Sequence, residues 1–209
     1  MAKPTDDRVR SCEERLWALI EERTLPGADL KRIDQRIWDL FGEEWTVMFT
    51  DLAGFSRQAA AFGIVHFLQI IHEKKKLLVP VISAHDGILV KVEADSFLVL
   101  FRRAASAIRC AVEMQRVCQR ASEHRAPEEQ ILLCIGIGSG PCLRIGDQDV
   151  WGAEVNAAAK LGEDTAKAHE VLATQATRDA AGDMPEVQFL DLGLAVPGSA
   201  QNYRVKYGR

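Results

Sequence analysis

The sequence lacks the features that would place the protein in a membrane or in an oxidising compartment. Its five cysteines are an odd number, are dispersed along the chain and form no CxxC pair, a pattern typical of free thiols in a reducing cytosol. The first residues have no apolar core of the kind found in signal peptides. The longest mostly apolar stretch, residues 59–71, is too short to span a bilayer. We therefore expect a soluble, cytoplasmic protein without a membrane partner.

A strong net charge is also missing, because the formal net charge is −4 over 209 residues. Such a chain has no general attraction for nucleic acid or for an anionic membrane, so we expect no nucleic-acid partner. Apolar residues make up 47% and charged residues 27% of the chain, which is an ordinary globular composition. A ligand with several phosphates would therefore have to be bound by local cations and metal ions.

Residues 1–42 are expected to form a helical extension, and residues 43–209 the main domain. Within the extension, apolar residues recur at helical spacing on both sides of Leu25-Pro26-Gly27. Asp29 is a suitable N-cap for the second helix, and Gly42 a suitable end for it. Two short amphipathic helices cannot form their own core, so they must pack on the main domain or on a second copy of the chain. We expect them to support such a dimer.

Strand and helix patterns alternate from residue 45 onward. The expected elements are strands at 46–49, 88–92, 96–101 and 131–137, with helices at 57–84 and 104–121. Read in order, they give an α+β fold with a ferredoxin-like βαββαβ core, followed by extra strands. The glycines in Gly138-Ser139-Gly140-Pro141 predict a turn after the fourth of these strands. A further helix is expected from Val155 to about residue 168.

Two aspartates lie at the ends of predicted strands. Asp51 ends the first strand, and Asp95 lies in the hairpin between the second and third strands. Oxygen ligands of this kind suit Mg²⁺, whereas each aspartate alone would also fit an ordinary helix start or turn. Backbone N–H groups of a strand-to-helix turn can bind phosphate. The turn after Asp51 consists of Ala53, Gly54, Phe55 and Ser56.

Asn156 and Lys160 are four residues apart, so on a helix they lie on the same face. An amide and a cation placed together can orient a ribose and neutralise phosphate charge. Considered in isolation, the pair also fits a solvated helix surface. The pattern alone leaves both interpretations open.

Three segments together carry a family resemblance. They are Phe-Thr-Asp-Leu-Ala-Gly-Phe-Ser at 49–56, Lys-Val-Glu-Ala-Asp at 91–95 and Asp-Val-Trp-Gly-Ala-Glu-Val-Asn at 149–156. Each is weak alone, but their order and separation are highly specific. From about residue 45 to 205 the chain resembles the catalytic domain of class III adenylate and guanylate cyclases.

The resemblance implies a homodimer in which two catalytic domains pair head to tail and share each active site. In one subunit Asp51 and Asp95, assisted by the Leu52 carbonyl, would bind two Mg²⁺ or Mn²⁺ ions. The turn that follows Asp51 would face the phosphates of ATP or another nucleoside triphosphate. The metal and phosphate sites would therefore belong to the same subunit.

The resemblance assigns the remaining functions to the other subunit. Lys91 and Asp149 match the positions that recognise the purine base, and this lysine–aspartate pair resembles the one that selects adenine. Asn156 would orient the ribose, and Lys160 would contact the phosphates. The resemblance therefore implies that one chain alone does not form a complete site.

Four residues differ from the family pattern, and one of these differences, Gly138 in place of a common histidine, is expected to be neutral. Lys160 replaces an arginine and lacks its planar, bidentate fork. Ala94 replaces a glycine, which matters if that position requires a positive φ. Glu93 replaces an apolar residue, and strand alternation places it on the same face as Lys91, where it can form an ion pair that weakens base recognition.

We expect an adenylate cyclase that converts ATP to 3′,5′-cyclic AMP and pyrophosphate at a homodimer interface. One alternative is a catalytically silent, cyclase-like domain that binds a nucleotide or regulates a partner. The other is a cyclase for another nucleoside triphosphate. The sequence alone does not separate the three.

Overall fold

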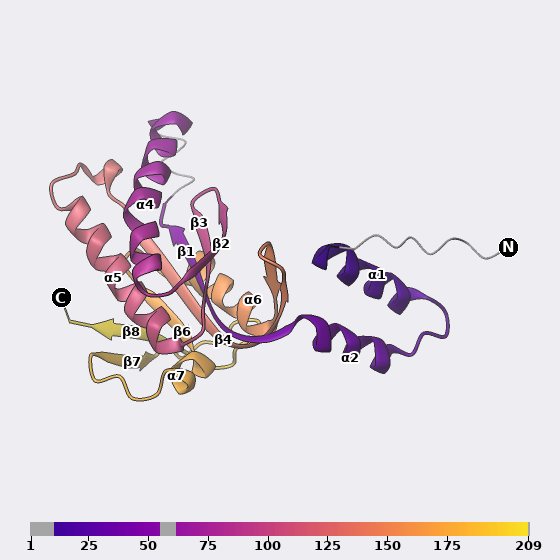
Figure 1. Cartoon of the computed structure of the whole chain (residues 1–209). Helices are drawn as coiled ribbons and strands as arrows, with labels where there is room; N and C mark the ends of the chain where they lie inside the picture. The colour runs from indigo at the N-terminus through magenta and orange to yellow at the C-terminus, as the bar shows by residue number, and fades with distance from the viewer. Residues whose placement is uncertain (1–10, 55–61, 209) are drawn as a thin grey trace.

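The computed structural model describes residues 11–54 and 62–208 (Figure 1). An eight-stranded sheet has the order β2-β3-β1-β4-β6-β8-β7, with β5 paired to β4 outside this path. The helices are α1 (Cys12–Thr24), α2 (Leu30–Phe41), α4 (Ile64–Ala84), α5 (Ala104–Ser122), α6 (Ala153–Ala159) and α7 (Gln175–Ala181), with a 3₁₀ turn η1 (Pro127–Glu129) and a π-helical turn η2 (Lys160–Thr165). The strands are β1 (Gly42–Leu52), β2 (Ile88–Glu93), β3 (Ser96–Phe101), β4 (Leu133–Ile145), β5 (Asp149–Trp151), β6 (Val171–Thr174), β7 (Val187–Asp191) and β8 (Asn202–Tyr207).

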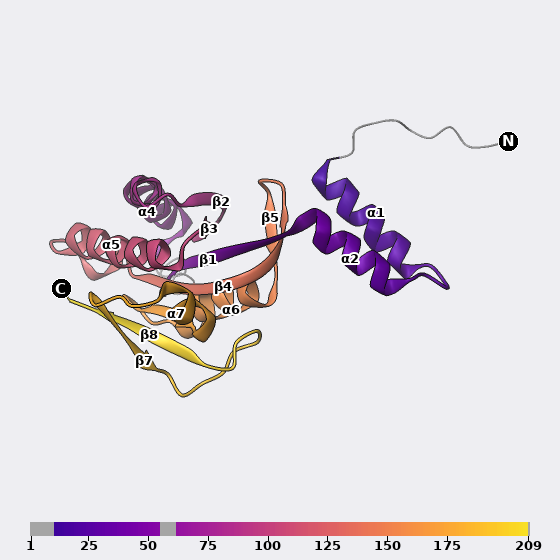
Figure 2. The same ribbon diagram turned by 60° about the horizontal axis from the view of Figure 1, so that its bottom comes forward.

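Strands β1 to β4 and helices α4 and α5 form the predicted ferredoxin-like core. Their chain order is β1-α4-β2-β3-α5-β4, and their order in the sheet is β2-β3-β1-β4. Helices α4 and α5 cover one face of the sheet, and α6 lies on the other face (Figure 2). Strands β6, β8 and β7 extend the sheet beyond β4. The prediction of an α+β fold with extra strands is confirmed.

The main hydrophobic core lies between the sheet and the layer of α4 and α5. Alternate side chains of the central strands point into it, such as Met48 and Ile135, and they meet Phe67 and Ile108 from the two helices. A smaller cluster on the opposite face packs around Trp45. Because both faces of the central strands are covered, these strands are apolar along most of their length.

Helix α6 lies directly against β4, and glycines in the strand make this contact possible. A Cβ added to Gly136 would lie 2.1 Å from the Ala158 carbonyl oxygen, and one added to Gly138 would lie 2.2 Å from that of Glu154. The predicted turn at residues 138–141 is wrong. The strand continues to Ile145 and pairs antiparallel with β1 from Leu133 to Leu143, because these glycines serve close helix packing and not chain reversal.

The helix predicted at 57–84 is shorter within the described residues and begins at Ile64. Gly63 precedes it with φ +88° and ψ 156°, a conformation that only glycine adopts readily and that interrupts a helix. The start expected at Arg57 lies outside the described residues. The helix predicted from Val155 to about 168 ends as α6 at Ala159 and passes into η2.

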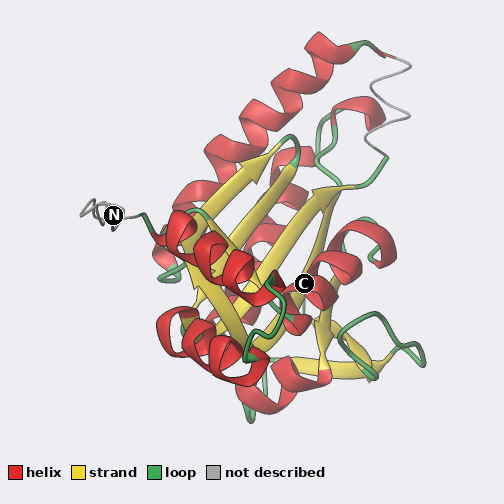
Figure 3. Ribbon diagram, turned by 90° about the vertical axis from the view of Figure 1, so that its right-hand side faces the viewer, coloured by secondary structure: helices red, strands yellow, loops and turns green. Residues whose placement is uncertain are grey.

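Helices α1 and α2 form a hairpin beside the main domain (Figures 1 and 3). As predicted, Asp29 caps α2 by accepting a hydrogen bond from the Arg32 N–H at 3.2 Å, and Gly42 ends the helix. The hairpin packs on the main domain through Ile145, at the end of β4, in a small core of its own. The hairpin exposes several large apolar side chains: Trp17, Leu25, Leu30, Trp38 and Leu40. Contact with a second copy stays a prediction.

The cysteines are free, as predicted, and all except Cys12 are buried. Burial raises the pKa of the Cys110 thiol to about 12, so this thiol is not reactive at neutral pH. Within residues 11–54 and 62–208, no helix combines the length and apolar character needed to cross a membrane.

We predict that Gly138→Ala lowers the free energy of unfolding by about 2–3 kcal/mol. The new methyl group would meet the Glu154 carbonyl, a backbone atom that moves only if α6 moves. Urea unfolding measures the change, and Gly208→Ala is the matched control because its Cβ would enter open space. Equal stability of the two variants would contradict the packing described here.

Candidate active site

The fold brings Asp51 and Asp95 together at one end of the central strands. Asp51 is the second-last residue of β1, and Asp95 lies in the tight turn between β2 and β3. Antiparallel pairing of β1 with β3 aligns Thr50 with Phe97, which places the turn beside the end of β1. The Ser96 hydroxyl donates a hydrogen bond to Asp51 Oδ1 at 3.3 Å. The two carboxylates are therefore neighbours, as the sequence predicted.

The electrostatics of this pair fit a cation site. Burial and the negative charge of Asp95 raise the pKa of Asp51 to about 6. Asp95 is only 7% exposed, and its Oδ2 has no hydrogen-bond partner, an arrangement that is costly for a buried oxygen unless something binds it. Two adjacent carboxylate groups of this kind match the oxygen ligands that Mg²⁺ prefers.

The turn that carries Asp95 is strained at Ala94, whose φ is +48°. This left-handed conformation costs a residue with a Cβ about 1–2 kcal/mol. The family glycine that Ala94 replaces would adopt it without that cost. The sequence analysis asked whether this position requires a positive φ, and the structure shows that it has one.

The turn expected to bind phosphate is only partly described. Phe55 and Ser56 lie outside the described residues. The Ala53 N–H donates to the Leu132 carbonyl at 2.8 Å, so it is already satisfied within the sheet. Gly54 follows with φ +83°, in a turn at the end of β1. Of the two described residues, Gly54 is the better candidate for a contact with phosphate.

Lys91 lies between two carboxylates. Its Nζ is 2.7 Å from Glu93 Oε1 and 3.4 Å from Asp149 Oδ2. The hydrogen bond with Glu93, followed by the negative charge of Asp149, raises the pKa of Lys91. The predicted pairing of Glu93 with Lys91 is confirmed. The proposed base-recognising pair is therefore assembled within one chain, with Glu93 as a competing partner.

A cavity of about 120 Å³ joins this pair to the carboxylate end of the sheet. Its lining residues are Phe49, Lys91, Glu93, Ser96, Leu98, Asp149 and Glu163. The sequence analysis missed Ser96 and Glu163. Burial, then the charges of Asp164 and Asp95, raises the pKa of Glu163. Its position just after Lys160 on the same helical segment was the only sequence signal for it.

Helix α6 is anchored at its first turn by Glu154. The carboxylate of Glu154 accepts hydrogen bonds from the Ser139 N–H at 3.1 Å and from the Thr174 hydroxyl at 2.7 Å. Asn156 on this helix and Lys160, the first residue of η2, are both exposed. Lys160 Nζ is 2.6 Å from Asp164 Oδ2, so the lysine that replaces the family arginine already has an acidic partner.

Among the described residues, no contact joins Asn156 or Lys160 to Asp51 or Asp95. The structure therefore assembles the carboxylate pair and the Lys91–Asp149 pair, and it leaves Asn156 on α6 and Lys160 at the start of η2 facing solvent. Lys74, which the sequence analysis did not select, lies buried behind the carboxylates on α4.

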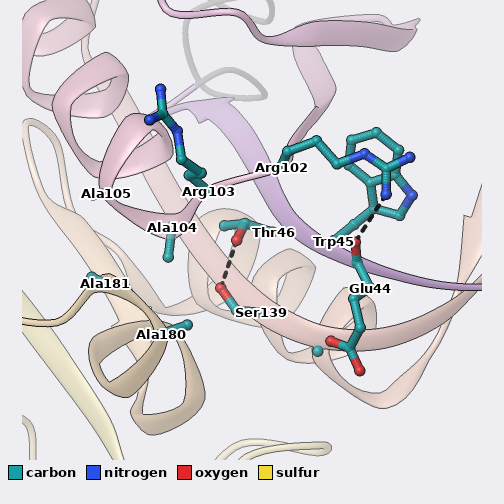
Figure 4. A pocket seen from close by; sticks show the side chains of 11 residues that line it. Glu44, Trp45, Thr46, Arg102, Arg103, Ala104, Ala105, Ser139, Ala180 and Ala181 are labelled. Atoms are coloured by element: carbon teal, nitrogen blue, oxygen red, sulfur yellow. Dashed lines mark hydrogen bonds between the residues drawn. The ribbon is translucent and has the colours of Figure 1, made fainter.

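A larger cavity, of about 380 Å³, lies at the other end of β1. Figure 4 shows Thr46 hydrogen-bonded to Ser139 within it and Arg102 stacked on Trp45. Its charged side chains are Glu44, Arg102 and Arg103, and it contains no pair of adjacent carboxylates. The smaller cavity is the better candidate because it combines Glu163, a carboxylate with a raised pKa, with the cation Lys91 and with Ser96, which is hydrogen-bonded to Asp51.

We predict that Asp51→Asn stabilises the metal-free protein at neutral pH. Because the pKa of Asp51 is raised from 3.8 to about 6, the folded state binds its proton more tightly than the unfolded state does. Stability of the parent should therefore fall as the pH rises from about 4 to 6 and stay constant above that. The variant should be more stable by about 1–2 kcal/mol above pH 6, after allowance for partial exposure, and equal near pH 4.

Urea unfolding in EDTA across this pH range measures the difference between the two proteins. Ser96→Ala is the control, because it removes a hydrogen bond to Asp51 without removing the charge. A stability difference that does not vary with pH would contradict the assignment of the raised pKa to Asp51.

Comparison with known proteins agrees with this geometry. A solved adenylate/guanylate cyclase/hydrolase from Silicibacter pomeroyi superposes with a TM-score of 0.70 at 25% identity and covers 80% of this chain and 98% of that one. The adenylyl cyclase CyaB from P. aeruginosa gives a TM-score of 0.68 at 22% identity, over 80% and 96% of the two chains. Guanylyl cyclases are also among the similar structures.

Sequence comparison gives the same family. The chain is 25% identical over 147 residues to a Rhizobium meliloti (strain 1021) protein with the provisional name adenylate cyclase 3. That match covers 70% of this chain but only 25% of the relative. Residues 42–193 match the family model of the adenylate and guanylate cyclase catalytic domain. The chain therefore belongs to the adenylate and guanylate cyclase catalytic-domain family.

Proposed function

We propose that the protein is an adenylate cyclase that converts ATP to 3′,5′-cyclic AMP and pyrophosphate at the interface of a homodimer. The observation that carries the proposal is that one chain presents both half-sites: a cavity lined by Lys91 and Asp149, and the carboxylate pair, where the Ser96 hydroxyl is hydrogen-bonded to Asp51. In the head-to-tail dimer that the family resemblance implies, Lys91 and Asp149 of one chain would bind the base of the nucleotide whose phosphates lie at the Asp51–Asp95 pair of the other. The Rhizobium meliloti relative and the fold of CyaB support the choice of ATP.

Asp51 and Asp95 would hold Mg²⁺ or Mn²⁺, with the Leu52 carbonyl as a further oxygen. When bound, such ions would lower the pKa of the ribose 3′-hydroxyl and offset negative charge as pyrophosphate leaves. Within the chain, Ser96 orients Asp51 through its hydrogen bond. The unpaired Oδ2 of Asp95 supplies an oxygen that is not committed to any protein donor.

Lys91 and Asp149 would bind the edge of the base. The ammonium group donates and the carboxylate accepts, which complements the N1 acceptor and the N6 amino donor of adenine. Guanine presents an acceptor and a donor in the reversed order along the same edge. Glu93 already forms an ion pair with Lys91, with 2.7 Å between Oε1 and Nζ. This competing partner favours the second candidate function, a cyclase for another nucleoside triphosphate.

Asn156 and Lys160 would come from the same subunit as Lys91 and Asp149, the amide orienting the ribose and the ammonium contacting phosphate. Both side chains are exposed, and in the described residues neither contacts the carboxylate pair of its own chain. To bind phosphate, Lys160 must leave Asp164. Exposed ion pairs of this kind are worth only about 0–1 kcal/mol, so the exchange is accessible.

We expect the protein to form cyclic AMP when ATP, GTP, CTP and UTP are supplied in turn with Mg²⁺ or Mn²⁺. Asp51→Ala should reduce the rate by at least about 10²-fold, because it removes a ligand of the ions that stabilise charge in the transition state. Chromatography of the products measures the outcome, and Glu129→Gln, on the exposed 3₁₀ turn, is the control.

Another cyclic product would retain the mechanism and favour the second candidate function. No cyclic product from a folded, dimeric protein would contradict the proposed catalysis and favour a silent nucleotide-binding domain.

Mixing two inactive variants tests the shared site. A mixed dimer of Asp51→Ala and Asn156→Ala would contain one site with both defects and one intact site. If subunits exchange freely, an equal mixture should regain about a quarter of the parent activity, since half of the dimers are mixed and each has one working site. Asp51→Ala mixed with Asp95→Ala is the control, because both changes fall in the same half-site. Failure to regain activity, with subunit exchange verified, would place all of these residues in one chain.

A further inference from the structure

Lys74 is a lysine in the hydrophobic core, with a relative exposure of 0%. It lies on α4 in a stripe with Ile70, Leu78 and Ile82, all of which are buried and spaced by four residues. Lysine is almost never fully buried unless it is paired. The two lysines that follow it, Lys75 and Lys76, are exposed.

The ammonium group of Lys74 makes its contacts within the protein. Nζ donates to the Thr50 hydroxyl at 3.2 Å and to the backbone carbonyl of Asp95. It also lies 4.4 Å from the centroid of the Phe97 ring, within the range of a cation–π interaction. An ammonium has three N–H donors, and two of them are used in these hydrogen bonds. Because the side chain is 0% exposed, a substrate does not reach the group, and Lys74 can act only by positioning other residues.

These contacts connect the two backbone segments that carry the candidate metal ligands. Thr50 immediately precedes Asp51 at the end of β1, and the Asp95 carbonyl belongs to the turn whose preceding residue, Ala94, is strained. Thr50 faces the α4 side of the sheet, whereas Asp51, its neighbour along the strand, points to the opposite side. One ammonium therefore links both segments from behind the carboxylate pair.

Charge gives this link a second effect. Burial lowers the pKa of Lys74 to about 8, while the charges of Asp95 and Asp51 act to raise it, so the group is cationic at neutral pH. A buried cation is tolerated only where opposite charge compensates it. Conversely, two adjacent buried carboxylates repel one another unless a cation is near. The lysine and the carboxylate pair thus stabilise each other.

We propose that Lys74 is a resident counter-ion and positioning residue, which holds the Asp51 and Asp95 segments in their metal-binding arrangement before any metal ion arrives. The inference rests on the metal site of the proposed function. It assigns to α4, a helix of the opposite layer, part of the organisation of that site. A bound divalent ion would supply positive charge to the same carboxylates, so the lysine matters most when the ion is absent.

The test compares thermal unfolding of the full chain in EDTA and in saturating Mn²⁺. We expect Lys74→Met, which keeps a similar length and removes the charge, to lower the melting temperature by at least about 5 °C in EDTA. In Mn²⁺ the loss should be less than half as large. Lys75→Met is the matched control, because it makes the same change one residue away on the exposed face, and it should have no effect in either condition.

A second comparison covers the case in which Lys74→Met is too unstable to fold. In an Asp51→Asn background one of the two charges that the lysine compensates is gone, so the penalty of Lys74→Met should shrink. The proposal is overturned if Lys74→Met lowers the melting temperature equally with and without Mn²⁺ and equally in the parent and in Asp51→Asn. Lys74 would then be an ordinary core residue. A double variant that also fails to fold, or the absence of any penalty, would overturn the proposal as well.

The same data separate this inference from the proposed function. If Mn²⁺ does not raise the melting temperature of the parent, the metal site itself is wrong. If Mn²⁺ stabilises the parent but leaves the penalty of Lys74→Met unchanged, only the assignment of Lys74 fails. Neither readout requires the protein to turn over a nucleotide.

Discussion

The pairing of β1 with β4 on one side and with β3 on the other determines where every candidate site residue lies. Eleven residue pairs, from Gly42 with Leu143 to Leu52 with Leu133, join β1 to β4. At one end of this pairing lies Asp51, beside the turn that β3 brings with it. At the other end β4 continues into the segment that returns as β5 and carries Asp149. A shift of the register by one residue would move Asp51 to the opposite face of the sheet.

Around this frame the charges are closely balanced. Lys74 donates a hydrogen bond to the backbone carbonyl of Asp95, and the Oδ2 atom of the same residue has no hydrogen-bond partner. The cavity nearby contains a further cation, Lys91, between two acidic groups. Almost every charge in the region has one partner in the protein and is positioned to exchange it for a ligand.

Local patterns predicted the parts of the fold and site that depend on near neighbours in the sequence. Alternation along β2 placed Glu93 on the face of Lys91, and the ion pair between them confirms it, although the register of β2 against β3 shifts between Leu89 and Lys91. The strand ends at Asp51 and the hairpin at Asp95 also follow from local pattern. Such features require only the strand period and the order of the elements.

The features that the sequence did not predict depend on contacts between distant segments. Gly138 lies in a glycine- and proline-rich segment typical of a turn. Its place within a strand is explained only by the close contact between the strand and α6. Lys74 has the appearance of a surface lysine next to Lys75, although its spacing with Leu78 on a buried stripe was a usable signal. Its partners lie 24 and 21 residues away along the chain. No local pattern encodes a contact of that kind.

The distribution of the four tryptophans gives the molecule two separate optical reporters. Trp17 and Trp38 on the N-terminal hairpin and Trp151 on β5 are between 44% and 54% exposed, whereas Trp45 is 4% exposed and lies under the Arg102 guanidinium at 3.6 Å. Burial of the hairpin or of β5 by another chain would shift the emission of the exposed indoles to shorter wavelength and leave Trp45 unchanged. Loss of the sheet would instead expose Trp45. Intrinsic fluorescence therefore distinguishes association from unfolding without any label.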